Sequence, residues 1–76
     1  MDDNQIEYKM IFVASCIEAV AKKLNITTEE VYKRMKNVDL INGYILKHYN
    51  VIHSESRDNI TTDIIECLKL WEQNKE

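Results

Sequence analysis

The residues of this chain best suited to chemistry are two histidines that fall in one short segment. His48 and His53 lie within residues 47–53, which also contain a tyrosine. Imidazole groups can bind a metal ion or transfer protons near neutral pH. Because the two histidines are five positions apart, a continuous helix would turn their side chains about 140° away from each other. That is poor geometry for two ligands of one metal ion.

An enzymatic site would have to combine His53 and Tyr49 with a carboxylate such as Asp63. The sequence supplies no evident nucleophile for it, and small helical domains seldom form a pocket that excludes water. We therefore expect no enzyme, no cofactor and no metal. His53 is expected to lie at a helix end, where it hydrogen-bonds carbonyl groups or a neighbouring tyrosine, with partner binding by Tyr49 and His53 as the alternative.

Residues 21–31 raise the possibility of DNA binding, because they resemble the centre of a helix-turn-helix. In that motif a small residue precedes a turn made by glycine or asparagine, and aliphatic residues follow it. Ala21, Asn25, Ile26 and Val31 match these positions. Arg34, however, stands where a further aliphatic residue should anchor the second helix.

The candidate contacts to nucleic acid are Lys33, Arg34 and Lys36, which form a basic cluster. A recognition helix reads bases mainly with its N-terminal residues, and here those are Glu29 and Glu30. The net charge of −3 also gives the chain no overall attraction to phosphates. A small DNA-binding regulator is therefore the alternative hypothesis, and nucleic acid is not the partner that we expect.

The composition is that of one globular helical domain. Among 76 residues, 45% are hydrophobic and 30% charged, which favours a folded core over a disordered chain. Because there is no proline and the only glycine is Gly43, long stretches contain nothing to interrupt a helix. No apolar run is long enough to cross a membrane, and the start of the chain is acidic, unlike a secretion signal. We expect a cytoplasmic protein that makes no membrane contact.

Apolar residues recur at helical spacing in four segments. The first, a helix from about residue 6 to 24, carries the stripe Ile6, Met10, Val13, Ile17, Val20 and Leu24. Asn25 can leave this helix in the left-handed conformation, and the Thr27 to Glu30 spacing predicts a capping box for the second helix. That helix buries Val31 and Met35 and frays near Asn37.

A third helix is predicted after a cap at Asp39 or Asn37. Its apolar members are Leu40, Ile41, Tyr44, Ile45 and Ile52. Gly43 inside it indicates either a close helix crossing or a break. Residues 54–58 form the predicted loop before the fourth helix, whose apolar face comprises Ile60, Ile64, Ile65, Cys67, Leu68 and Trp71.

These patterns predict an all-α protein, either a small compact bundle or an orthogonal array of four helices. Residues 1–76 would form a single domain with frayed ends near 1–4 and 74–76. Cys16 and Cys67 fall within the apolar patterns and lack metal-binding spacing, so both are expected to be buried free thiols.

Two aliphatic residues depart from the pattern and suggest a contact surface. Ile11 projects among charged residues of the first helix, and Leu70 does so on the fourth. Isolated exposed aliphatic residues are common, so the simplest interpretation gives them no role. As a contact surface, they would combine with residues that flank the core. The partner-binding candidates are then Ile11, Phe12, Leu70, Trp71, Tyr49 and His53.

The chain also resembles a group of short bacterial proteins known as domain of unknown function 3791, over about residues 6–70. The resemblance is carried by segments 11–18, 21–26 and 31–32, and more specifically by Tyr49-x-Val51-Ile52-His53 with Asp63-Ile64-Ile65-Glu66. Ile52 replaces the family's usual leucine, and the family's second helix is variable, so the basic cluster finds no support there. The resemblance implies a small helical accessory protein, and some members are encoded beside ADP-ribosyltransferase-like proteins.

Together, these observations favour a non-enzymatic module for protein-protein interaction. Its partner would be another protein or a second copy of the chain. The resemblance suggests an antitoxin-like or accessory role toward the product of a neighbouring gene.

Overall fold

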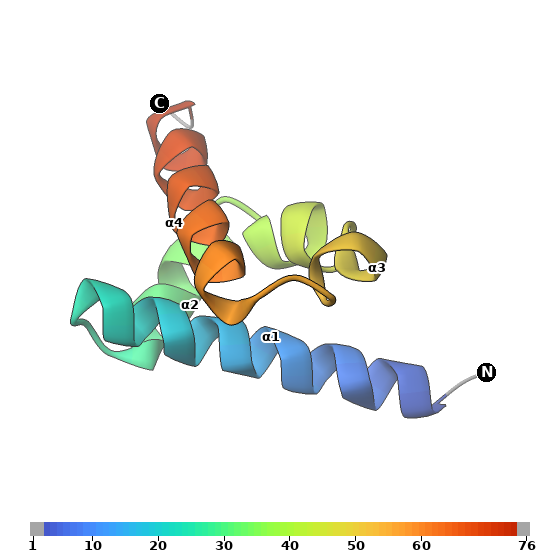
Figure 1. Ribbon diagram of the computed structural model, residues 1–76. Coiled ribbons are helices and arrows are strands. Elements are labelled where there is room, and N and C mark those ends of the chain that lie inside the picture. The colour runs from blue at the N-terminus through green and yellow to red at the C-terminus, as the bar shows by residue number, and fades with distance from the viewer. Residues whose placement is uncertain (1–2, 75–76) are drawn as a thin grey trace.

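The computed structural model describes residues 3–74, all of whose regular elements are helical. The elements are α1 (Asp3–Leu24), α2 (Thr28–Asn37), the π-helical segment η1 (Ile41–Ile45), the single turn α3 (Tyr49–Ile52) and α4 (Arg57–Asn74) (Figure 1). The predicted all-α class is confirmed. Of the predicted frayed ends, residues 1–2 and 75–76 lie outside the described residues. Asp3, Asn4 and Asn74 belong to α1 and α4.

The turn between α1 and α2 forms as its residues predict. Asn25 has a φ of 60°, the left-handed conformation that asparagine tolerates. The backbone N–H of Ile26 then donates to the carbonyl of Ala21 at 3.0 Å. At the start of α2, the hydroxyl of Thr27 accepts a hydrogen bond from the backbone N–H of Glu30 at 3.1 Å. The two helices are thus joined by a short, defined connection.

The predicted third helix is not continuous, and its N-cap position is neither Asp39 nor Asn37. Asp39 adopts a φ of 57°, and the N-cap position belongs to Leu40, which makes no side-chain cap hydrogen bond. The wide turn of η1 is closed by the N–H of Leu46, which donates to the carbonyl of Ile41 at 2.8 Å. α3 then adds one separate turn. The fourth helix also begins earlier than predicted, because Arg57 and Asp58 belong to α4.

Gly43 lies where η1 meets the end of α4. A Cβ atom at this position would come within 3.2 Å of the indole ring of Trp71. Such a contact is tight, so the missing side chain lets the ring rest against the backbone of η1. The sequence left a close crossing and a break as alternatives for Gly43, and the structure shows a close approach within an irregular segment.

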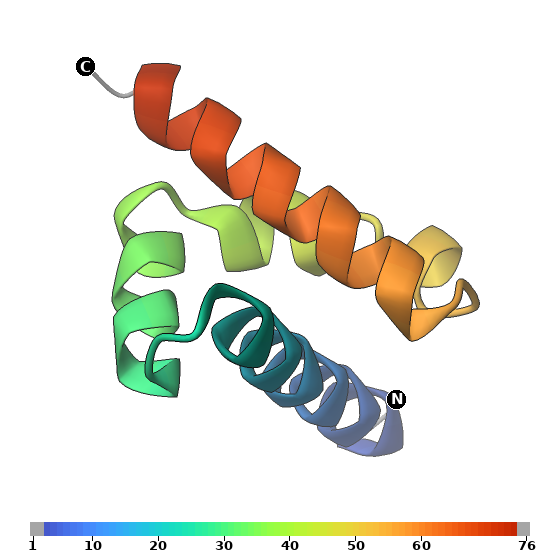
Figure 2. The same ribbon diagram turned by 60° about the vertical axis from the view of Figure 1, so that its left-hand side comes forward.

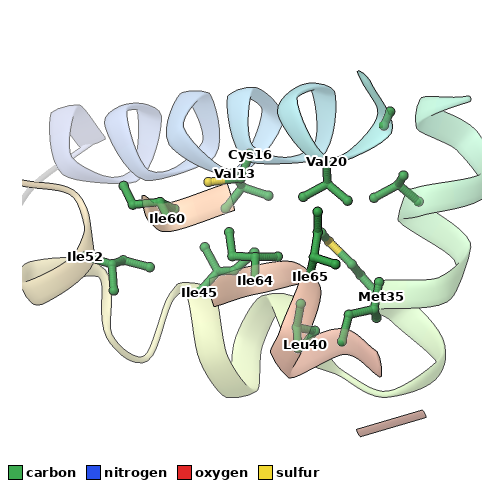
Figure 3. Packing of buried hydrophobic residues seen from close by; sticks show 13 residues of the cluster. Val13, Cys16, Val20, Met35, Leu40, Ile45, Ile52, Ile60, Ile64 and Ile65 are labelled. Carbon is green, nitrogen blue, oxygen red and sulfur yellow. The ribbon is translucent and has the colours of Figure 1, made fainter. Parts of the chain in front are cut away.

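The core lies where α1, α2, η1 and α4 meet (Figure 3). Figure 3 shows Val13, Cys16 and Val20 projecting from α1 toward residues of α4. The buried apolar residues are Val13, Cys16, Val20, Ala21, Val31, Met35, Leu40, Ile45, Ile52, Ile60, Ile64, Ile65 and Leu68. Both cysteines are free: Cys16 is buried, as predicted, and Cys67 is half-buried.

The N-terminal half of α1 differs from its prediction. Ile6 and Met10 were expected to belong to the core stripe, yet they are 62% and 58% exposed. The reason is the length of the helix, since α1 extends past α2 and α4, which cover only its C-terminal half (Figures 1 and 2). The apolar stripe therefore continues along α1 beyond the end of the core.

The long helices cross one another, so the arrangement is an array and not a parallel bundle (Figures 1 and 2). An ion pair joins two of them. The guanidinium of Arg34 on α2 donates two hydrogen bonds, each 2.8 Å long, to the carboxylate of Glu72 on α4. This bidentate geometry is the strongest form of an arginine-carboxylate pair. It connects residues that are far apart in sequence.

Replacing Arg34 by methionine is expected to lower the free energy of unfolding by up to about 1 kcal/mol, because the pair is partly exposed. The hydrogen bonds from Arg34 lower the pKa of Glu72 below 4.5. A carboxyl whose folded-state pKa is lowered stabilises the fold at pH values above its unfolded pKa, and this contribution is lost as pH falls through the folded value. Urea unfolding at pH 7 and pH 3 measures it. The stability gap between the two proteins should shrink at the lower pH, and an equal gap at both values would contradict this account.

Candidate interaction surface

The N-terminal half of α1 carries a cluster of exposed apolar side chains. Ile6, Tyr8, Met10 and Ile11 are between 58% and 65% exposed. Positions three and four apart lie on the same side of a helix. Six exposed residues therefore share one side, which we call the α1 face: Ile6, Glu7, Met10, Ile11, Ala14 and Glu18. Exposed apolar residues gathered on one helix side are typical of a contact site, unlike exposed apolar residues that occur singly.

Every exposed charge on the α1 face is negative. Glu7 and Glu18 are both exposed, and the third charged residue between positions 6 and 18 is Lys9. Lys9 is half-buried and directs its Nζ atom over the ring of Tyr49, 5.5 Å from the ring centroid. This cation-π contact holds the ammonium group on the side of α1 that faces α3. The exposed side of the helix therefore combines apolar groups with carboxylates.

An apolar groove continues the α1 face toward α2. One hollow of about 460 Å³ is lined mainly by apolar residues of α1, α2 and η1, among them Met10, Ile17 and Ile41, and also by the charged residues Lys36 and Asp39. A neighbouring hollow of about 750 Å³ shares Ala14, Ile17 and Tyr32. Tyr32 is itself 47% exposed. The apolar surface thus extends from the free end of α1 along its junction with α2.

Three partner-binding candidates of the sequence form one aromatic cluster between α1 and α3. The rings of Phe12 and Tyr49 meet edge to face with their centroids 5.3 Å apart. The ring of His53 stacks on Tyr49 at 4.7 Å, and its Nδ1 lies 2.7 Å from the carbonyl oxygen of Tyr49. Since His53 is the C-cap residue of α3, its expected place at a helix end is confirmed. These contacts give the cluster a packing role that attaches α3 to α1.

The other candidates lie on separate parts of the molecule. Ile11 is 65% exposed on the free half of α1, and Leu70 is 57% exposed near the C-terminal end of α4. These parts of the two helices point in different directions (Figure 1). Trp71 packs on Gly43 and meets the ring of Tyr44 edge to face at 6.4 Å. The structure therefore does not unite Ile11 and Leu70 in one surface.

The basic cluster is divided by the fold. Arg34 is held by Glu72, while Lys33 and Lys36 are exposed and line the hollow beside Glu18 and Glu29. The acidic residues Glu29 and Glu30 occupy the first turn of α2, where a recognition helix would contact bases. Lys33 and Lys36 thus share their surroundings with carboxylates, which lowers the local attraction for a phosphate backbone.

Among the side chains that the structure describes, those of residues 6–74, no three of histidine, cysteine, aspartate or glutamate come together as a metal site. In the same part of the chain, every buried side-chain nitrogen and oxygen has a hydrogen-bond partner. Asp63 acts electrostatically on Tyr44: burial raises the pKa of this phenol, and the charge of Asp63 raises it further. None of the described helices has the length and apolar character of a membrane span.

The sequence did not identify Ile6 and Met10 as surface residues. Their spacing is the same as that of the core positions further along α1, so the apolar pattern alone could not separate them. Only the length of α1 compared with that of the later helices gave a signal, because a helix of 22 residues outreaches neighbours of 10 and 18 residues.

A comparison with protein families gives one match. The family model described as Protein of unknown function (DUF3791) matches residues 11–71. No curated protein and no solved structure matches the chain.

Proposed function

The chain belongs to the family described as Protein of unknown function (DUF3791), and we propose that it is a non-enzymatic module that binds another protein through the α1 face. The observation that carries this proposal is the exposure of Ile6, Met10 and Ile11 on one side of the N-terminal half of α1. Keeping three large apolar side chains in water forgoes hydrophobic stabilisation. Covering them with a partner would recover it.

The aromatic cluster supports the α1 face mechanically. Phe12 and Lys9 both contact Tyr49, so α3 packs against a side of α1 that faces away from Met10 and Ile11. The free half of α1 is consequently held by packing, and its face is ordered before a partner arrives. A preformed face lowers the entropy that binding would otherwise lose.

A narrower form of the proposal is an antitoxin-like or accessory role in the cytoplasm, directed at the product of a neighbouring gene. A helical domain of this size could cover a surface of its partner and either block or stabilise it. The alternative function, DNA binding through residues 25–36, has in its favour the defined turn at Asn25. A mobility-shift assay at about 50 mM salt tests it, because low salt favours phosphate contacts.

Site-specific photo-crosslinking in cells tests the interaction proposal. A photoreactive amino acid at Ile11 is expected to give a crosslink to one defined protein. The same amino acid at Leu70, an equally exposed aliphatic on α4, is the control and should not capture that protein. Co-expression of the neighbouring gene product tests the narrower form.

The double substitution Met10→Ser and Ile11→Ser should abolish the crosslink formed from a photoreactive residue at Ala14 without unfolding the chain, since both side chains are exposed. Equal capture from Ile11 and Leu70, or capture that survives the double substitution, would contradict the proposal.

A further inference from the structure

The charges on the α1 face define the kind of partner that fits it. We infer, on the basis of the proposed function, that the α1 face takes an amphipathic segment of another protein in which apolar side chains are flanked by lysine or arginine.

Glu7 and Glu18 fix the sign of the complementary surface. On the surface of α1, positions 7, 11, 14 and 18 are spaced by four, three and four residues. They therefore form a single row along the helix. The two carboxylates lie at the ends of this row, with Ile11 and Ala14 between them. A partner that covers the apolar centre must therefore approach both carboxylates. Basic side chains at its edges would pair with them, whereas acidic ones would be repelled.

Lys9 does not neutralise this face. Its ammonium group lies over the ring of Tyr49 and points to the α3 side of α1. The nearest exposed lysine further along α1 is Lys22, one turn beyond Glu18. Between Ile6 and Glu18 the exposed residues of α1 itself are accordingly acidic or apolar, and the nearby lysines belong to α2, where Lys33 and Lys36 line the hollow beside Glu18.

A second copy of the chain fits this face poorly. In a symmetric antiparallel pair, equivalent flanks of the two helices lie side by side. The register that packs Ile11 on Ala14 of the other copy also sets Glu7 against Glu18 twice. A register that brings Glu7 to Lys22 places Ile11 against Glu18 instead. Each of these two registers thus loses either charge pairing or apolar contact, and neither pairs the apolar centre and the carboxylates together.

Two synthetic helical peptides with the same apolar stripe test the inference, one flanked by arginine and the other by glutamate. Fluorescence anisotropy with the full chain is expected to show about tenfold tighter binding of the basic peptide, as two exposed ion pairs replace two repulsions. The preference should weaken at about 500 mM salt because the charges are then screened.

Charge reversal on the protein provides the matched control. The double variant Glu7→Lys/Glu18→Lys is expected to invert the preference between the peptides. Glu55→Lys/Glu66→Lys makes the same change in net charge at exposed sites away from α1 and should leave the preference intact.

Four results would overturn the inference: no binding of the basic peptide, equal affinity for both peptides, inversion by the control variant, or a stable dimer that the Ile11→Ser variant abolishes. The proposed function fails separately, through the crosslinking experiment. A partner captured at Ile11 while the peptides show no charge preference would remove only this inference.

Discussion

Replacing Leu68 by alanine is expected to lower the free energy of unfolding by about 2 to 5 kcal/mol. Leu68 is fully buried on α4, so its truncation removes apolar contacts and leaves a cavity in the core. A chain of 76 residues has a total stability of only about 4 to 11 kcal/mol. The substitution therefore removes a large fraction of the stability, and the midpoint of urea unfolding, followed by circular dichroism, should fall steeply.

Leu70 provides the matched control on the same helix. Leu70→Ala makes the same chemical change at a residue that is 57% exposed, and we expect a loss of no more than about 0.5 kcal/mol. Similar losses for Leu68→Ala and Leu70→Ala would mean that α4 presents a different face to the core. The comparison thus tests the helix phase on which both the fold and the exposed surfaces depend.

Cys16 is expected to react with iodoacetamide at pH 8 about 100-fold more slowly than an ordinary cysteine. Burial raises the pKa of its thiol from 9.0 to about 11, an effect that Arg57 only partly opposes. Each unit of pKa lowers the thiolate fraction about tenfold, and the thiolate is the reactive form. The side chain is also 1% exposed, so reagent access requires the fold to open.

Cys67 serves as the internal comparison for this experiment. It is half-buried, and burial raises its pKa as well, but part of its surface meets solvent. Mass spectrometry of timed samples should therefore show Cys67 alkylated first in the folded protein. Both thiols should react at the same rate in denaturant. Equal rates in the folded chain would contradict the position assigned to Cys16.

The same apolar stripe runs along both halves of α1, but it is buried in one half and exposed in the other. Its C-terminal half supplies Val13, Cys16 and Val20 to the core, and its N-terminal half supplies the α1 face. This division explains how a domain with a small core can still present an extended apolar surface. Truncating a core residue should therefore reduce stability, whereas truncating the exposed Ile11 should leave stability nearly unchanged and, under the proposed function, reduce binding.

Local chemistry is what the sequence predicted best. The left-handed Asn25 and the Thr27 cap depend on backbone groups within a few residues, and both form as predicted. The end position of His53 is also local, because its ring bonds the carbonyl of Tyr49 four residues before it. Such contacts depend little on the rest of the fold.

In the segment between α2 and α4, the local sequence pattern did not predict the backbone conformation. Residues 39–52 carry a helical pattern of apolar residues, yet they form η1 and the separate turn α3. Trp71 packs against Gly43 from a helix far away in sequence, and Tyr49 is drawn to Phe12 of α1. These distant contacts decide the local backbone. Gly43 indicated a close approach or a break, but the sequence did not show that Trp71 would be the residue in contact.

The sequence by itself determined that the chain is helical, where its first two helices meet, and which residues form the apolar stripe of each helix. These features depend only on the spacing of residues and on neighbouring groups. Only the tertiary structure decided which part of each apolar stripe is covered. Burial depends on how far one helix extends beyond the others, so Ile6 and Met10 lie in solvent while Val13 and Val20, on the same stripe, lie in the core.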